Sequence, residues 1–287
     1  MQTFFTSPSI ISWNDLTFYS VDTISIREIN HAQEISSSRY GKCDATVTHL
    51  VHEISCTSAL DWDQAAELFS MIPPEPGASL LGSTPLVLTM RDGTTYQCQA
   101  AALTQWPEVF LGCDNRFMGK IVFQAVQPIA SAPVNISSAT WPASNASLPA
   151  QDRFTAAWGV TSPWNSFISS TGFKVQIKVE HTPVYSNALG LVDLIATDLQ
   201  TTLSCTPVGI STFHLATKLK INDSTGLYGS TLADVAQDLT LTSASNDLTL
   251  TMKQAALQNF QTEQTNGTCM FVSHGFRPGE QLPVILT

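Results

Sequence analysis

Strict alternation of apolar and polar residues predicts β-strands in both halves of this chain. The clearest case is LTLTSASNDLTLT (Leu239–Thr251), where Leu and Thr alternate on both sides of a polar turn. An earlier segment, LVLTMRDGTTYQCQ (Leu86–Gln99), alternates around Asp92-Gly93, a pair typical of hairpin turns. Because a period of two places alternate side chains on opposite faces of a strand, we predict a β-hairpin at each segment.

A helical period predicts one short amphipathic helix in each half. In SALDWDQAAELFSMIPP (58–74), Trp62, Ala65, Ala66 and Phe69 share one face, Asp61 is a suitable N-cap, and two prolines end the segment. The second candidate is GISTFHLATKLKI (209–221), with apolar residues on one face and Ser211 or Thr212 as cap. Strands clearly outnumber helices in both halves. We therefore predict an α+β fold that is mainly antiparallel β.

The predicted elements occur twice in the same order. GKCDATVTHLVHEISCT (Gly41–Thr57) and GLVDLIATDLQTTLSCT (Gly190–Thr206) are both seventeen residues long and are identical at seven positions. Each is followed by a helix candidate, a Gly-Ser turn, a hairpin, an Ala-Ala-Leu step and a closing strand pair. A repeat of this length indicates duplicated domains rather than a solenoid. We predict a first domain at 1–127, a linker rich in Pro, Ser and Ala at 128–152, and a second domain at 153–287.

Composition changes this picture in one respect, the scarcity of charge. Charged residues make up 13% of the chain, whereas about 25% is usual for soluble proteins. A surface so poor in charge suggests that partners cover much of it. The net charge of −10 argues against a protein that binds phosphates, because nucleic-acid affinity comes mainly from Lys and Arg.

The N-terminal sequence MQTFFTSPSIISWNDL has no basic, apolar leader, so we expect synthesis in a bacterial cytoplasm, without a membrane span.

No residue pattern indicates catalysis, a cofactor or a metal site. Cysteines form no C-x-x-C pair, and the repeat aligns Cys43 with Val192 and Cys98 with Met252, which is typical of buried small apolar positions. His49 and His52 are spaced so that a strand would point them to opposite faces. We find no nucleophile elbow, phosphate loop or zinc-protease motif, and we expect no enzymatic activity.

The tryptophans allow two interpretations. Four of them lie in loop-like contexts with proline nearby: Trp106, Trp141, Trp158 and Trp164. Exposed rings of this kind bind sugars in carbohydrate-binding modules. Tryptophan is more often an anchor within a core or an interface, and we favour that interpretation.

One stretch resembles a protein family. ALTQWPEVFLGCDNRFMGKIVF (102–123) resembles a pattern in the tail tube proteins of long-tailed bacteriophages and prophages, through Ala102, Leu103, Thr104, Pro107, Gly119 and Phe123. FTAAWGVTSPWNSF (Phe154–Phe167) and LSCTPVG (Leu203–Gly209) look like parts of the second tube domain in duplicated members. The second copy departs from the pattern after Leu257, where QNFQTEQTNG has no proline matching Pro107.

The resemblance implies two tail-tube-like β-sandwich domains, each flanked by one helix, whose strands join those of neighbours around a lumen. Three duplicated chains would make a pseudo-hexameric ring of about 24 strands, wide enough for an open channel. The expected function is that of a major tail tube protomer of the virion, whose stacked rings conduct DNA during ejection. Expected partners are further copies of the chain, the terminator, distal tail and tape measure proteins, and double-stranded DNA that passes without specific binding.

The resemblance also suggests site residues. We predict that two polar loops, HAQEISSSRY (His31–Tyr40) and HTPVYSNALG (His181–Gly190), act as stacking arms between rings; a plain hairpin tip is the alternative. Candidate stacking residues are His31, Gln33, Glu34, Arg39, Tyr40, His181, Tyr185 and Asn187. Candidate lumen carboxylates are Glu53, Asp92 and Asp247. Two other functions stay open: a distal tail or tail terminator ring, and a carbohydrate- or receptor-binding β-module.

Overall fold

Within the residues that the structure describes, the chain folds into two antiparallel sheets and one short helix, at the place that the sequence predicts for the first helix. A computed structural model describes residues 2–5, 9–39, 41–90, 93–112, 117–126, 130–132, 153–186, 190–210, 236–244, 248–262, 267–275 and 284–287. Within these ranges one sheet has ten strands and the other has eight, and every strand pairing is antiparallel. The mainly antiparallel α+β class is therefore confirmed.

The ten-stranded sheet is built from the first half of the chain. Its strands are β1 (Gln2–Phe5), β2 (Ser9–Trp13), β3 (Leu16–Ser20), β4 (Ile24–Ser37), β5 (Gly41–Leu60), β6 (Leu86–Thr89), β7 (Thr95–Cys98), β8 (Ala101–Gln105), β10 (Phe117–Ala125) and β11 (Ala130–Ala132). The eight-stranded sheet contains β9 (Val109–Leu111), β12 (Phe154–Trp158), β13 (Ser169–Ser186), β14 (Gly190–Pro207), β15 (Gln237–Ser243), β16 (Thr249–Thr262), β17 (Gly267–His274) and β18 (Val284–Leu286). Both hairpins predicted from alternation are present, as β6–β7 and β15–β16.

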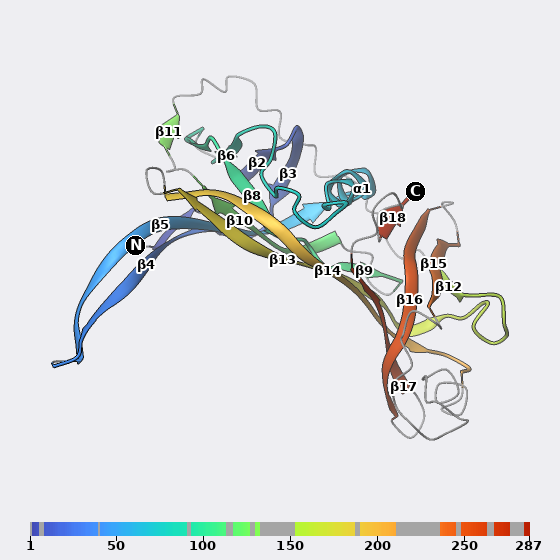
Figure 1. Cartoon of the computed structure of the whole chain (residues 1–287). Helices are drawn as coiled ribbons and strands as arrows, with labels where there is room; N and C mark the ends of the chain where they lie inside the picture. The colour runs from blue at the N-terminus through green and yellow to red at the C-terminus, as the bar shows by residue number, and fades with distance from the viewer. Residues whose placement is uncertain are drawn as a thin grey trace.

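Figure 1 shows the long strands β4, β5, β10, β13 and β14 as one curved band. The helix and the short strands β2, β3 and β6 lie on its convex side, and the β4–β5 hairpin extends beyond the rest of the molecule. The helix α1 (Trp62–Ser70) begins with a capping box, because the Asp61 side chain accepts from the Gln64 amide and the Gln64 side chain accepts from the Asp61 amide. The predicted helix at 209–221 lies almost wholly outside the described residues and stays a prediction.

Matched contacts in the two sheets support the duplication. Trp13 donates its indole N–H to the Ala101 carbonyl at 3.1 Å, and Trp158 donates to the Ala255 carbonyl at 2.8 Å. Ala101 and Ala255 begin the Ala-Ala-Leu step that the sequence repeats. Each tryptophan also packs edge-on against a phenylalanine of the following hairpin, Trp13 on Phe123 at 5.3 Å and Trp158 on Phe271 at 5.0 Å between ring centroids.

The long hairpins repeat even their irregularities. In β4–β5 the register shifts at two places, and the extra residues are Thr48 and Cys43. In β13–β14 it also shifts at two corresponding places, and the extra residues are Thr197 and Val192, the partners of Thr48 and Cys43 in the sequence repeat. β-Bulges at equivalent positions indicate one inherited hairpin design. The predicted domain limits fall on residues outside the described ranges and stay predictions.

Candidate assembly surfaces

The two halves are joined by a strand that crosses between them. The chain leaves the β8–β10 hairpin after Gln105, and β9 pairs with β13 of the second half, with Val109 opposite Val175 and Leu111 opposite Phe173. Pro107 lies at this exit, and proline has no N–H to continue a ladder. No pattern of residues predicts which sheet accepts this three-residue strand.

Close contacts hold β9 in place on both sides. Lys174 of β13 pairs with the Glu108 carboxylate at 2.8 Å and lies over the Phe110 ring at 5.4 Å from its centroid. On the other side, β10 approaches the backbone before β9 so closely that a Cβ at Gly119 would lie 2.6 Å from the Glu108 nitrogen. Gly119 is one of the residues on which the family resemblance depends, and this close approach requires glycine.

A second link joins the halves beside β14. The segment after α1 runs along the edge of β14: Gly77 N–H donates to Ala196 at 2.8 Å, Leu80 N–H donates to Leu194 at 2.8 Å, and Ala196 N–H donates back to Ala78 at 2.9 Å. The Ser79 hydroxyl also bonds the Asp193 carboxylate at 2.6 Å. The first half therefore satisfies the backbone of a strand edge in the second half.

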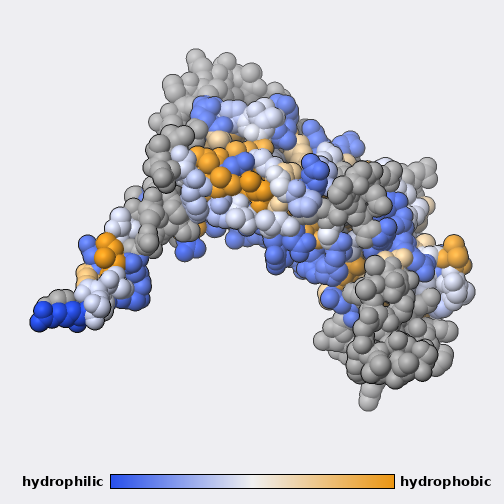
Figure 2. Space-filling view, in the orientation of Figure 1, coloured by the Kyte–Doolittle hydropathy of each residue, from blue (hydrophilic) through white to orange (hydrophobic). Residues whose placement is uncertain are grey.

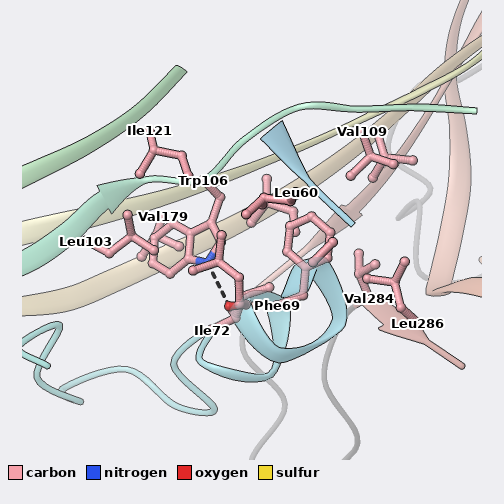
Figure 3. Close-up of a cluster of buried hydrophobic side chains, with 14 of the residues drawn as sticks. Leu60, Phe69, Ile72, Leu103, Trp106, Val109, Ile121, Val179, Val284 and Leu286 are labelled. Atoms are coloured by element: carbon pink, nitrogen blue, oxygen red, sulfur yellow. Dashed lines mark hydrogen bonds between the residues drawn. The ribbon is translucent and has the colours of Figure 1, made fainter. Parts of the chain in front are cut away.

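The seam between the halves has a shared apolar core. Figure 3 shows Trp106 and Phe69 of the first half gathered with Val179, Val284 and Leu286 of the second. The Trp106 indole N–H donates to the Leu68 carbonyl at 3.4 Å, which ties the segment between β8 and β9 to α1. Trp62 of α1 stacks on Phe154 of β12 with ring centroids 6.3 Å apart. Because these side chains are buried, each half contributes to the apolar core of the other.

The predicted stacking loops are strands instead, so this part of the prediction is wrong. β4 continues to Ser37 and β13 to Ser186, and each hairpin turns only before a glycine with positive φ, Gly41 or Gly190. Polar composition suggested loops, but the strands continue without a break to Ser37 and Ser186, and the bulges absorb the irregular register. We call the part of the β4–β5 hairpin from residue 32 to residue 47 the arm.

The structure separates the two sets of predicted stacking residues. His31, Gln33 and Glu34 lie on β4, with Arg39 in the turn that follows, whereas His181 and Tyr185 lie on β13. Tyr40 and Asn187 lie outside the described residues. The arm is exposed, with Lys42 and Glu34 paired at 2.5 Å and Ile35 47% exposed. Figure 2 shows hydrophobic atoms on this otherwise hydrophilic projection. The β13–β14 hairpin instead contacts the first half, with β13 against β8 and β14 against β5.

The face of the curved band opposite the core is polar. Polar side chains form rows across the strands of this face. In one such row, Glu53 of β5 lies between Arg27 of β4 and Gln124 of β10. Figure 2 shows mainly hydrophilic atoms along this concave side. Both signs of charge occur on this face: Arg27, Lys120, Lys174 and Lys178 with Glu53, Glu180 and Asp198. Glu53, a predicted lumen carboxylate, is thus on the polar face, half-buried, while Asp92 and Asp247 lie outside the described residues.

The described titratable residues form no reactive cluster. Burial raises the pKa of the Cys56 thiol to about 12. Contact with Cys269, 3.3 Å between sulfur atoms, together with burial raises the pKa of Cys205 well above its usual range. Thiols of this kind stay protonated and are poor nucleophiles. Among the described residues, no three His, Cys, Asp or Glu side chains lie close enough together to hold a metal ion.

Three of the four tryptophans considered for sugar binding are buried. Trp106 and Trp158 are each 2% exposed and Trp164 is 1% exposed, so a sugar ring cannot reach them. Trp141 lies outside the described residues. The burial of Trp106 in the seam agrees with the anchor interpretation.

No protein-family model matches the chain, and no curated protein matches it either. Within the described ranges, no helix is both long and apolar enough to cross a membrane.

Proposed function

We propose that this protein is a structural protomer of a bacteriophage tail tube. On this proposal three chains form a pseudo-hexameric ring, the rings stack into a hollow tube, and the polar concave face lines the lumen. The observation on which the proposal mainly depends is the seam. Two similar half-molecules are joined there by a strand that passes from one sheet to the other, so that their long strands follow one curved band. Repeating this joint between chains would close a wall.

The polar face suits a channel for DNA. Its described basic side chains are balanced by carboxylates, and Lys174 and Lys178 are each paired at 2.8 Å, to Glu108 and Glu180. Affinity for DNA grows with the number of phosphates that free Lys and Arg neutralise. A wall on which Lys174 and Lys178 are already paired offers fewer free cations to phosphates, which favours passage of double-stranded DNA without specific binding.

The arm supplies a surface for contacts beyond the ring. Residues 34–36, 38–39 and 41–46 of the arm are exposed, and they belong to a hairpin with no covering element in the described structure. A contact that is head-to-tail and does not close gives a filament, which is what a tail tube requires. We propose that the arm contacts the next ring, and that the terminator, distal tail and tape measure proteins meet the same tube in the virion.

Negative-stain microscopy and light scattering of the purified full chain, dilute and concentrated, test this function. We expect particles with the mass of three 31.1 kDa chains at low concentration and hollow tubes of uniform width at high concentration. Isolated rings that never stack would favour the distal tail or terminator role. A particle that stays monomeric at every concentration would contradict the proposal.

A further inference from the structure

Two short strands, β1 and β9, occupy the same place in the two sheets. Ser55 and Ser204 are matched positions of the sequence repeat, so they align the two sheets. Ser55 pairs with Ser25 of β4 and Ser204 pairs with Lys174 of β13, which makes Ser25 and Lys174 equivalent. In this register, Ile24–Ile26 of β4 corresponds to Phe173–Val175 of β13. β1 pairs with the first stretch and β9 with the second.

The two strands reach this place by different routes. β9 comes from the other half of the molecule, whereas β1 comes from the N-terminus of the same half. Each of them ends the strand order of its sheet. At the seam within the chain, β9 is the strand at this position, and it links the two half-molecules.

Among the described residues, the matching hairpin of the second half, β16–β17, has no segment that could act as β9 does. In the first half Gln105 pairs with Val122, a separation of 122 − 105 = 17 positions that includes β9. The corresponding pair in the second half is Asn259 with Met270, and 270 − 259 = 11. That shorter hairpin stays paired out to Thr262 and Gly267, so no strand leaves it. A joint between the second half of one chain and the first half of the next must take its linking strand from elsewhere.

We propose that β1 is this linking strand and that its outer edge is the surface at which a second copy of this chain docks. This inference rests on the ring proposed above, and it names the element that closes the ring. β1 stays on its own β4 and presents its unpaired N–H and C=O groups to the second half of the neighbouring chain. The occupant is a second copy because the same position on β13 is already filled by a strand that joins two half-molecules.

The sequence of β1 supports a docking role. An edge strand of a protein that stays monomeric is normally protected by charge, proline or a covering element. β1 reads QTFF, with no charge and no proline, and no described strand lies on its outer side. Strand addition to an exposed edge is a common mode of protein association, in which backbone hydrogen bonds supply much of the affinity.

The test is a pair of variants in β1. Neighbouring residues of an edge strand point their N–H groups in opposite directions, so Thr3→Pro/Phe4→Pro removes one group facing β4 and one facing outward. Thr3→Val/Phe4→Tyr keeps both N–H groups and is the matched control. We expect the control to form rings and tubes like the wild type. The proline variant should stay monomeric, with association at least ten times weaker by light scattering.

Hydrogen exchange on the unaltered chain gives a second readout that does not depend on how the proline variant folds. The amides of residues 2–5 should exchange more slowly in assembled particles than in dilute protomers. If the wild type forms rings but the proline variant assembles equally well, or these amides show no added protection, β1 is not the linking strand and the ring proposal still stands. Better assembly by the proline variant would show that β1 blocks association, and this result would overturn the inference. A wild type that never assembles overturns both.

Discussion

The hairpins β4–β5 and β13–β14 have similar backbone pairing, but the outer part of the first is exposed and that of the second is covered. They share two bulges, a closing glycine with positive φ and a common register. Yet Leu191, Leu194 and Ala196 of the second hairpin are 4% exposed or less, while Lys42 and Ala45, which correspond to Leu191 and Leu194, are exposed. The first half of the chain covers the second hairpin, and nothing described covers the first.

This difference shows how a duplicated domain can supply both sides of an interface. Side chains that face a permanent neighbour in the same chain are apolar, because they are buried as soon as the protein folds. At two of the corresponding places the arm has Lys42 and Ala45 in place of leucines, which suits a surface that the free chain keeps in water before it meets a partner. The way in which the first half of the chain covers β13–β14 therefore suggests how another copy of the chain can cover the arm.

The strongest test of this comparison is the same substitution at the two matched positions. Leu194→Asp would place a carboxylate at a site 1% exposed, and we expect it to lower the free energy of unfolding by about 4 kcal/mol or more. Ala45→Asp on the exposed arm should change it by less than about 0.5 kcal/mol. Urea unfolding followed by tryptophan fluorescence measures both. Similar losses at the two positions would show that the arm is covered in the free chain.

Shortening the arm should separate assembly from stability. His31 and His49 are cross-strand partners below the outer bulges, so residues 32–48 can be replaced by Asn-Gly, which favours a two-residue hairpin turn. We expect tube growth to stop, and the urea midpoint to stay close to that of the wild type because the removed segment is exposed. Unimpaired tubes of the shortened chain, seen by electron microscopy, would remove the arm from the stacking contact.

The repeated tryptophans allow a finer test of whether the halves are equivalent. Trp13→Phe and Trp158→Phe each remove the indole donor of a buried alanine carbonyl, which costs about 1–3 kcal/mol. The smaller loss should occur at Trp13, because the Ala101 carbonyl keeps the Gly82 N–H at 3.1 Å. We expect the two losses in unfolding free energy to agree within about 1 kcal/mol, since both rings also pack on an equivalent phenylalanine. A large effect at one position alone would argue that the halves have diverged in their cores.

The smallest expected effect concerns an exposed ion pair on the polar face. A hydrogen bond and the charge of Lys178 hold the pKa of the Glu180 carboxyl below its ordinary value. A depressed carboxyl pKa adds stability at neutral pH that is lost as the pH falls through the folded-state value. Glu180→Gln should therefore lower the urea midpoint slightly at pH 7, with the difference from wild type closing in acid and in high salt. A difference that persists in acid would point to a packing effect instead.

Alternation and the helical period correctly predicted two hairpins and one helix. Leu-Thr alternation gave the β15–β16 hairpin, and Asp61 with the apolar face of 62–69 gave α1. Both signals are local, because each depends only on neighbours in the sequence. The repeat also identified β5 and β14 as equivalent strands before their register was known.

The joint between the halves could not be predicted in the same way. β9 has three residues, and no sequence pattern says which sheet edge such a segment joins. The absence of a proline matching Pro107 was visible, but its meaning, a hairpin that stays paired instead of releasing a strand, depends on long-range pairing. The stacking arms were mistaken for loops because polar residues are common both in loops and in strands exposed on both faces.

A reconstruction of the assembled particle by electron cryo-microscopy tests the central claim most directly, since it shows the joint within a chain and the joint between chains side by side. The account predicts that the two joints superpose, with β1 beside β4 at one and β9 beside β13 at the other, and with the polar face toward the lumen. Chains that meet through other surfaces, or a lumen lined by the helix side of the band, would contradict it.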